Sequence, residues 1–145
     1  NQVAFTSDDF SPFHFIDEMA SRGWGVQPQF GYHGSEANVH ISIGQKTDEL
    51  SNAFIAALRE SVDACRDKGF SQTAAKVKAE LSRMNIADFK PAMMSDLMRA
   101  AGIEDGQLPR KSAELNQVLN VLPPNVTAFA LTEFMNDRYI YRPKR

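Results

Sequence analysis

The chain has 145 residues with a formal net charge of −2, and 43% of its residues are hydrophobic. This length suits one domain with a sizeable core, and the apolar content excludes a disordered chain. No run of about 18 apolar residues appears, so we expect no membrane span in this segment. The near-neutral charge without a basic cluster argues against nucleic acid as the main partner.

Cysteine usage and the first residues suggest where the chain comes from. Cys65 is the single cysteine, which excludes an internal disulfide and a cysteine-based zinc site. This usage is typical of a reducing compartment, and we expect a cytoplasmic protein. The chain starts at Asn1 and reads as a strand almost at once, which predicts a piece of a longer protein.

The first thirty residues predict a strand, a helix and a second strand. Residues 3–6 read as a strand, and Ser7-Asp8-Asp9 is typical of a helix start. Apolar residues then recur at spacings of three and four up to a stop at Gly23. Residues 24–32 read as extended. Pro28 lacks a backbone donor, so this strand should lie at an edge or hold Pro28 at an unpaired position.

The next elements complete a compact α+β unit. Residues 38–43 alternate apolar and polar side chains, which predicts a half-buried strand. A long helix should begin at Thr47 and end at Lys68-Gly69, with one apolar face: Leu50, Phe54, Leu58, Val62 and Cys65. We therefore predict a domain over residues 1–69 in the order strand-helix-strand-strand-helix. It should be a small antiparallel sheet with both helices on its apolar face.

Residues 70–145 read as a helical extension. Apolar spacings predict helices near residues 74–84, 93–98, 115–122 and 129–137, and Pro123-Pro124 should end the third. The methionine-rich stretch at 93–98 is typical of helix packing rather than of a metal site. The tail at 138–145 is aromatic and basic.

The sequence contains no self-contained active site. It has no glycine-rich phosphate loop, no Gly-x-Ser-x-Gly elbow and no His-Glu-x-x-His pair, so we expect neither a catalytic residue nor a metal site. His14 reads as a helix-surface residue. His40 and Ser42 share the polar face of a strand, but residues two apart lie ~6.6 Å apart, too far for a direct hydrogen bond. A polar face covered by another subunit or domain is the favoured interpretation.

Two other places offer candidate ligand contacts. Tyr32 and His33 lie in the glycine-flanked loop 31–37, from which both side chains could reach a ligand. Tyr139 and Arg142 in the tail could bind an anion or dock on another surface, although a solvated terminus explains them equally well.

Four stretches carry a resemblance to a known family: Met19 to Trp24, Gln29-Phe30, Val39 to Ile43 and Phe54 to Val62. Together they resemble the C-terminal small domain of fold-type-I pyridoxal-phosphate-dependent enzymes, of the sphingosine-1-phosphate lyase and group II decarboxylase type. In those enzymes a helix ending in Gly-Trp precedes two antiparallel strands, and a long helix follows. The resemblance covers about residues 3–66 and is weak after Gly69.

The resemblance implies a parent enzyme that breaks a bond at Cα, or between Cα and Cβ, of an amine or amino-acid substrate. It implies pyridoxal 5′-phosphate held by a lysine of an upstream large domain, typically after a histidine; no lysine here follows a histidine. This chain would close over that site and be inactive alone. Tyr32, His33, Tyr139 and Arg142 are then the candidate contacts to the substrate's acidic group. Family members are usually homodimers.

Two other functional classes stay open. A free-standing binding or interaction module predicts a natural start codon close to Asn1 and reversible folding without partners. An independent hydrolase built on His40 and Ser42 lacks the nucleophile elbow and an orienting acid. Within the resemblance, Val39-His40 and the run from Leu58 to Val62 favour the lyase branch slightly over the decarboxylases.

Overall fold

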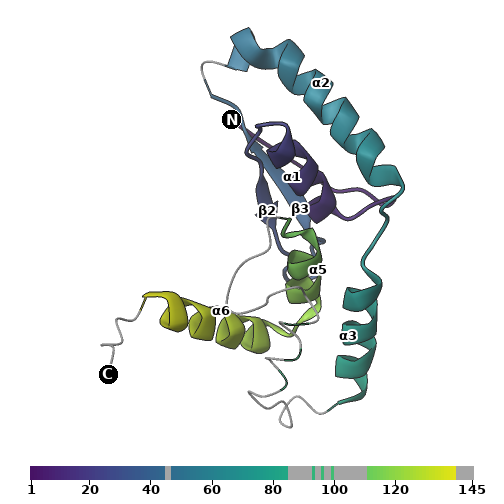
Figure 1. Ribbon diagram of the computed structural model, residues 1–145, viewed down its shortest axis with the longest axis vertical. Helices are drawn as coiled ribbons and strands as arrows, with labels where there is room; N and C mark the ends of the chain where they lie inside the picture. The colour runs from purple at the N-terminus through teal and green to yellow at the C-terminus, as the bar shows by residue number, and fades with distance from the viewer. Residues whose placement is uncertain (45–46, 85–92, 94–95, 97–98, 100–110, 140–145) are drawn as a thin grey trace.

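The computed structural model of the chain describes residues 1–44, 47–84, 93, 96, 99 and 111–139 (Figure 1). Its described elements are β1 (Gln2–Phe5), α1 (Pro12–Ser21), β2 (Gln27–Gln29), β3 (Asn38–Ser42), α2 (Thr47–Arg66), α3 (Gln72–Arg83), α5 (Ala113–Val121) and α6 (Pro124–Tyr139). The fold is α+β with a small antiparallel sheet, as predicted. Most of the predicted helix at 93–98 and all of the tail beyond Tyr139 lie outside the described residues.

The sheet has the order β1-β3-β2, and both pairings are antiparallel. The predicted pairing of β2 with β3 is confirmed. Pro28 lies opposite Val39 on β2, which is an edge strand, as its missing backbone donor predicts. The strand spans only Gln27–Gln29, which is shorter than the extended stretch predicted at 24–32.

Helix α1 begins four residues later than the sequence suggested. Ser11, rather than Ser7, is its N-cap, and the Ser11 hydroxyl accepts a hydrogen bond from the backbone N–H of Phe13. Pro12 follows at the first helical position, where a missing donor is harmless and the fixed φ favours the helix. The helix ends where predicted, at Arg22 and Gly23, and the φ of Gly23 is +84°.

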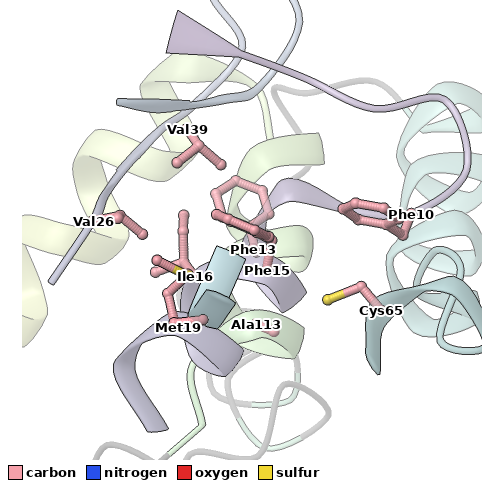
Figure 2. Packing of buried hydrophobic residues seen from close by; sticks show 10 residues of the cluster. Phe10, Phe13, Phe15, Ile16, Met19, Val26, Val39, Cys65 and Ala113 are labelled. Atoms are coloured by element: carbon pink, nitrogen blue, oxygen red, sulfur yellow. The ribbon is translucent and has the colours of Figure 1, made fainter. Parts of the chain in front are cut away.

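The first hydrophobic core lies between the sheet, α1 and α2. Figure 2 shows side chains from α1, β3, α2 and α5 gathered around Phe13 and Phe15. The Phe15 ring packs edge-to-face on Phe5, with ring centroids 5.3 Å apart. Ala113, the first residue of α5, belongs to the same cluster. The helical extension therefore contributes to the core of the α+β region.

Helix α2 packs mainly on α1, and its predicted apolar face is buried unevenly. Cys65 is fully buried and Phe54, Leu58 and Val62 are partly buried against the core. Leu50, however, is 51% exposed. The packed part of the helix thus runs from Phe54 to Cys65, where it lies against α1.

Helices α3 and α5 pack on each other and form a second core cluster: Ala74, Leu115, Val118, Leu119, Leu122 and Val126. Phe30, in the loop after β2, contacts both clusters. Helix α5 ends before Pro123-Pro124 as predicted, and α6 begins at Pro124 itself. Figure 1 shows α6 projecting away from the rest of the chain.

Candidate functional site

A groove of about 480 Å³ lies where the α+β region meets the helical extension. Its wall is built from the loop before α1, the loop after β2, the start of α3 and the last turns of α5. Its lining includes Asp8, Gly31, Glu36, Phe70, Lys78 and Asn120. Its volume falls in the range of small-molecule sites, roughly 300–1,000 Å³.

The groove carries charges of both signs. Asp8 and Glu36 contribute carboxylates and Lys78 an ammonium group, and no ion pair within the described residues involves them. Phe70 adds an aromatic ring that is 56% exposed. Such a wall can bind a small polar ligand. The Ser71 hydroxyl in this wall donates to Glu114 Oε1 and accepts the backbone N–H of Ala74, which makes Ser71 the N-cap of α3.

The floor of the groove is fixed by a hydrogen-bonded chain between α1, α3 and α5. The backbone N–H of Ser71 donates to Gln117 Oε1 at 2.8 Å, so the amide Nε2 of Gln117 faces the other way. That Nε2 lies 3.2 Å from His14 Nε2. Because the amide can only donate, His14 must accept there as a neutral ring protonated on Nδ1. Burial, with the nearby Lys68, lowers the pKa of His14 and favours this neutral form.

Asp17 of α1 caps the N-terminus of α5 from a different element. Its carboxylate accepts the backbone N–H groups of Ser112 at 3.1 Å and Ala113 at 2.9 Å, and also the Ser112 hydroxyl. Ser112, the N-cap residue by position, makes no capping bond with its own side chain. Asp17 thus supplies both the acceptor and the negative charge that a helix start favours.

Glu18, next to Asp17, forms ion pairs with three basic side chains. Its carboxylate pairs with Arg22 at 2.8 Å, with Lys68, and with Lys111 at 3.4 Å. The Glu18 side chain is only 10% exposed. The hydrogen bonds from Lys68 and Arg22 lower the pKa of Glu18 to about 2. The carboxylate therefore stays ionised and ties α1 to the segment before α5.

Asn120 closes the groove at its other end. Its Oδ1 accepts the backbone N–H of Gly31 at 2.8 Å. A Cβ on Gly31 would meet the carbonyl oxygen of Ser35 at 2.9 Å, so the loop requires glycine there. The loop 31–37 is therefore attached to α5 as well as to the sheet.

Tyr32 and His33 form the tip of this loop. They do not belong to the groove wall, which takes Gly31, Ser35 and Glu36 from the same loop. The Tyr32 side chain is 67% exposed, and its ring contacts the His33 ring edge-on with centroids 4.1 Å apart. His33 has a φ of +48°, so the turn holds both rings outward in a conformation that few residues adopt.

The remaining predicted positions are separate from the groove. Tyr139 is the last residue of α6, but its side chain and all of Arg142 lie outside the described residues. His40 lies on β3 opposite Ala4 and Gln27, and Ser42 opposite Gln2. These residues form the sheet face away from Val39, and no described contact joins His40 to Ser42.

The contacts between α1 and α5 were missed by sequence reasoning. His14 and Gln117 are 103 positions apart, and Asp17 and Ala113 are 96 apart. A helical aspartate or histidine carries no local signal for a partner at that distance. The one available hint was the second acid, Glu18, beside Asp17 on a helix with a buried face.

Residues 71–137 match a family model described as "Pyridoxal-dependent enzyme, C-terminal putative HTH domain". This segment contains α3, α5 and most of α6. This segment is similar to the C-terminal domain of pyridoxal-dependent enzymes. The match supports a resemblance to pyridoxal-dependent enzymes in general. It lies in residues 71–137, where the resemblance read from the sequence is weak. Searches of curated proteins and of solved structures found no match.

The description of the matching family model refers to a helix-turn-helix, and α5 and α6 are two helices joined by a short turn. Only Leu122 and Pro123 separate the two helices. The charged residues from Ala113 to Tyr139 are Glu114, Glu133, Asp137 and Arg138, which give no basic surface. The unit thus lacks the positive charge on which phosphate contacts depend.

The groove does not fit pyridoxal phosphate. The cofactor needs a lysine, an acid beside its ring nitrogen and a cradle for its phosphate. Lys78 is the single cation in the groove wall, and Asp8 and Glu36 would oppose the phosphate charge. Among the described residues, no group of three or more His, Cys, Asp or Glu is placed to hold a metal ion. Nor does the described part contain a helix long and apolar enough to cross a membrane.

Proposed function

We propose that this chain is the C-terminal portion of a pyridoxal-phosphate-dependent carbon–carbon lyase, either an aldehyde-lyase or an amino-acid decarboxylase. An upstream large domain carries the cofactor and its lysine, and the substrate is a small amine or amino acid. Two copies of the enzyme form a homodimer. The observation that carries the proposal is the match of residues 71–137 to a C-terminal domain of pyridoxal-dependent enzymes.

The hydrogen bonds between α1 and α5 support the proposal that the α+β region and residues 71–137 close over the active site as one unit. Asp17 caps α5, and His14 bonds to Gln117 of the same helix. The α+β region and residues 71–137 are therefore attached to each other by directional bonds. Such a unit can move as one body over an active site, exclude water and bring its loops to the substrate.

Tyr32 and His33 are the proposed substrate contacts within this unit. Both rings lie at the tip of a turn that is anchored by Asn120 and exposes Tyr32. A phenol and an imidazole can each donate a hydrogen bond to an acidic group. Tyr139 and Arg142 remain the second proposed pair.

Intact mass of the natively expressed protein, before and after borohydride reduction, tests the proposal. Reduction fixes pyridoxal onto its lysine as a stable pyridoxyl adduct. We expect a subunit much larger than 16.2 kDa that gains this adduct. A native chain that starts near Asn1 and gains no adduct would instead establish a free-standing module.

Substitution of the turn tests the proposed contacts. In the parent enzyme, Tyr32→Ala with His33→Asn removes both rings, and asparagine tolerates the positive φ at position 33. We expect KM to rise about tenfold, since a hydrogen bond to a charged group contributes about 1.5–3 kcal/mol. Glu80→Ala, at an exposed position of α3, is the matched control. Unchanged turnover and KM would remove the turn from the active site.

A further inference from the structure

We propose that the groove between the α+β region and the helical extension binds a basic α-amino acid such as arginine. This inference goes beyond the proposed function because it assigns a ligand to the groove itself. It begins from the three charged side chains of the groove wall, Asp8, Glu36 and Lys78. Two are acidic and one is basic, and no ion pair within the described residues neutralises any of them.

These charges select the class of ligand. An anion such as a phosphate would be opposed by Asp8 and Glu36, and a simple amine would be opposed by Lys78. An uncharged ligand would displace water from all three charged groups without pairing them. A ligand with two cationic groups and one carboxylate pairs with all three, and a basic α-amino acid carries this set of charges.

The end of the groove at Glu36 and Asn120 fits the head group of an amino acid. Asn120 Oδ1 accepts the backbone N–H of Gly31, and a Cβ on Gly31 would lie 2.9 Å from the carbonyl oxygen of Ser35 and 3.5 Å from the nitrogen of Ala37. The residues on either side of Glu36 therefore lie close to Asn120. The Nδ2 group of Asn120 keeps its two donors, since no hydrogen bond within the described residues uses them. Glu36 can accept from the α-ammonium group while Asn120 donates to the α-carboxylate.

Lys78 adds a positive charge for the same carboxylate. It lies on α3, about 10 Å along the helix from Ser71. Helix α3 packs beside α5, where Ser71 is bonded to Gln117, one turn before Asn120. The ammonium group and the amide thus belong to neighbouring helices of one groove wall, and a charged hydrogen bond from Lys78 would add to the bond from Asn120.

The end of the groove at Phe70 fits the basic side chain. The backbone N–H of Ser11 donates to the carbonyl of Gly69 at 3.0 Å, which brings the loop that carries Asp8 beside the segment that carries Phe70. The Phe70 ring lines the groove and is 56% exposed. A guanidinium group can stack on an aromatic ring and pair with a carboxylate at the same time. Phe70 and Asp8 supply these two partners.

Hydrogen exchange of the full-length protein tests the site. L-arginine should slow the exchange of backbone amides in peptides that cover residues 31–37 and 70–78, because the bound ligand stabilises the groove wall. Agmatine lacks the carboxylate, Nα-acetyl-L-arginine lacks the α-ammonium group and L-norvaline lacks the guanidinium group, so each should protect these peptides much less. No protection by L-arginine, or equal protection by any of the three analogues, would overturn the proposal.

Two variants with matched controls assign the contacts. Lys78→Met and Asp8→Asn should each raise the dissociation constant for L-arginine about tenfold. Lys76→Met and Asp9→Asn, at exposed positions outside the groove lining, should leave it unchanged. Equal effects of a variant and its control would overturn the proposal.

The pyridoxyl adduct is measured on the same samples, so that the two proposals can fail separately. Protection of the groove by L-arginine in a protein without an adduct would refute the proposed function and leave the ligand site intact. An adduct in a protein whose groove L-arginine does not protect would refute the ligand site alone.

Discussion

Helix α1 meets its two helical neighbours through different chemistry. Toward α2 the contacts are mainly apolar: Met19 and Ala57 are buried, and Trp24, just beyond α1, packs edge-to-face on Phe54 at 5.1 Å. One exposed ion pair, between Arg22 and Glu60, joins them at 3.3 Å. Toward α5, His14 and Asp17 accept hydrogen bonds from Gln117, Ser112 and Ala113, and the apolar contact is limited to the small side chain of Ala113. Apolar burial is non-directional and tolerates repacking, whereas these bonds allow one position of α5. The comparison indicates that the first interface supplies stability and the second supplies precise placement.

The largest expected effect is in the apolar core. Phe15 is fully buried, so Phe15→Ala should lower the free energy of unfolding by about 3–5 kcal/mol. Urea denaturation measures it, with Phe70→Ala, at a 56% exposed ring, as the control. A loss below about 1 kcal/mol for Phe15→Ala would contradict a core centred on this ring.

The Glu18 cluster should dominate acid sensitivity. The pKa of Glu18 is about 2 in the folded chain against an ordinary 4.5. Its stabilisation is therefore complete above pH 4.5 and lost as pH falls toward 2. Glu18→Gln should lower the free energy of unfolding at pH 7 by about 2 kcal/mol and flatten this acid limb. Glu60→Gln, at an exposed partner of Arg22, is the control, and equal effects of the two variants would refute the assignment.

Loss of the cap contributed by Asp17 should follow in size. Asp17→Ala leaves the Ser112 and Ala113 donors without an acceptor, which should cost about 1–2 kcal/mol. Amide hydrogen exchange at these two residues should accelerate, whereas exchange in α2 should change little. Asp63→Ala, at an exposed acid of α2, is the control. Unaltered exchange at the start of α5 would contradict a cap from α1.

The smallest expected effect is a decline in stability between neutral and mildly acidic pH. The pKa of His14 is lowered in the folded chain, so the unfolded chain binds the proton more readily below pH 6.5. Stability should therefore fall as pH drops through this window. Lys68, Glu114, Asp17 and Glu18 are the charged groups around the ring. His14→Gln should remove the slope in thermal unfolding, and persistence of the slope would assign it to another group.

The elements that carry the apolar core could largely be predicted from the sequence. The spacing of apolar residues gave β3, α2 and the end of α1, because burial imposes a period on the chain. The predicted start of α1 is wrong by four residues. Ser7-Asp8-Asp9 contains residues that favour an N-cap, but Ser11 is followed by Pro12, which favours the first helical position. The uneven burial of α2 could not be predicted, because the pattern does not say where the neighbouring helix ends.

The hydrogen bonds between elements far apart in the sequence could not be predicted. The glycines around residues 31–37 predict a loop, but the attachment of Gly31 to Asn120 spans 89 positions. His14 was interpreted as a helix-surface residue, yet its ring is half-buried against Gln117. Hydrogen bonds between distant side chains leave no period in the sequence. Only the assembled fold reveals them.

Coincidence of unfolding tests most directly whether the hydrogen bonds between α1 and α5 join the two regions into one unit. Trp24 is the single tryptophan of the chain and reports on the α+β region, while far-ultraviolet circular dichroism also reports on α3, α5 and α6. In urea, both signals of the 145-residue chain should follow one transition, and Asp17→Ala should separate them. Two separate transitions in the unaltered chain would contradict the account.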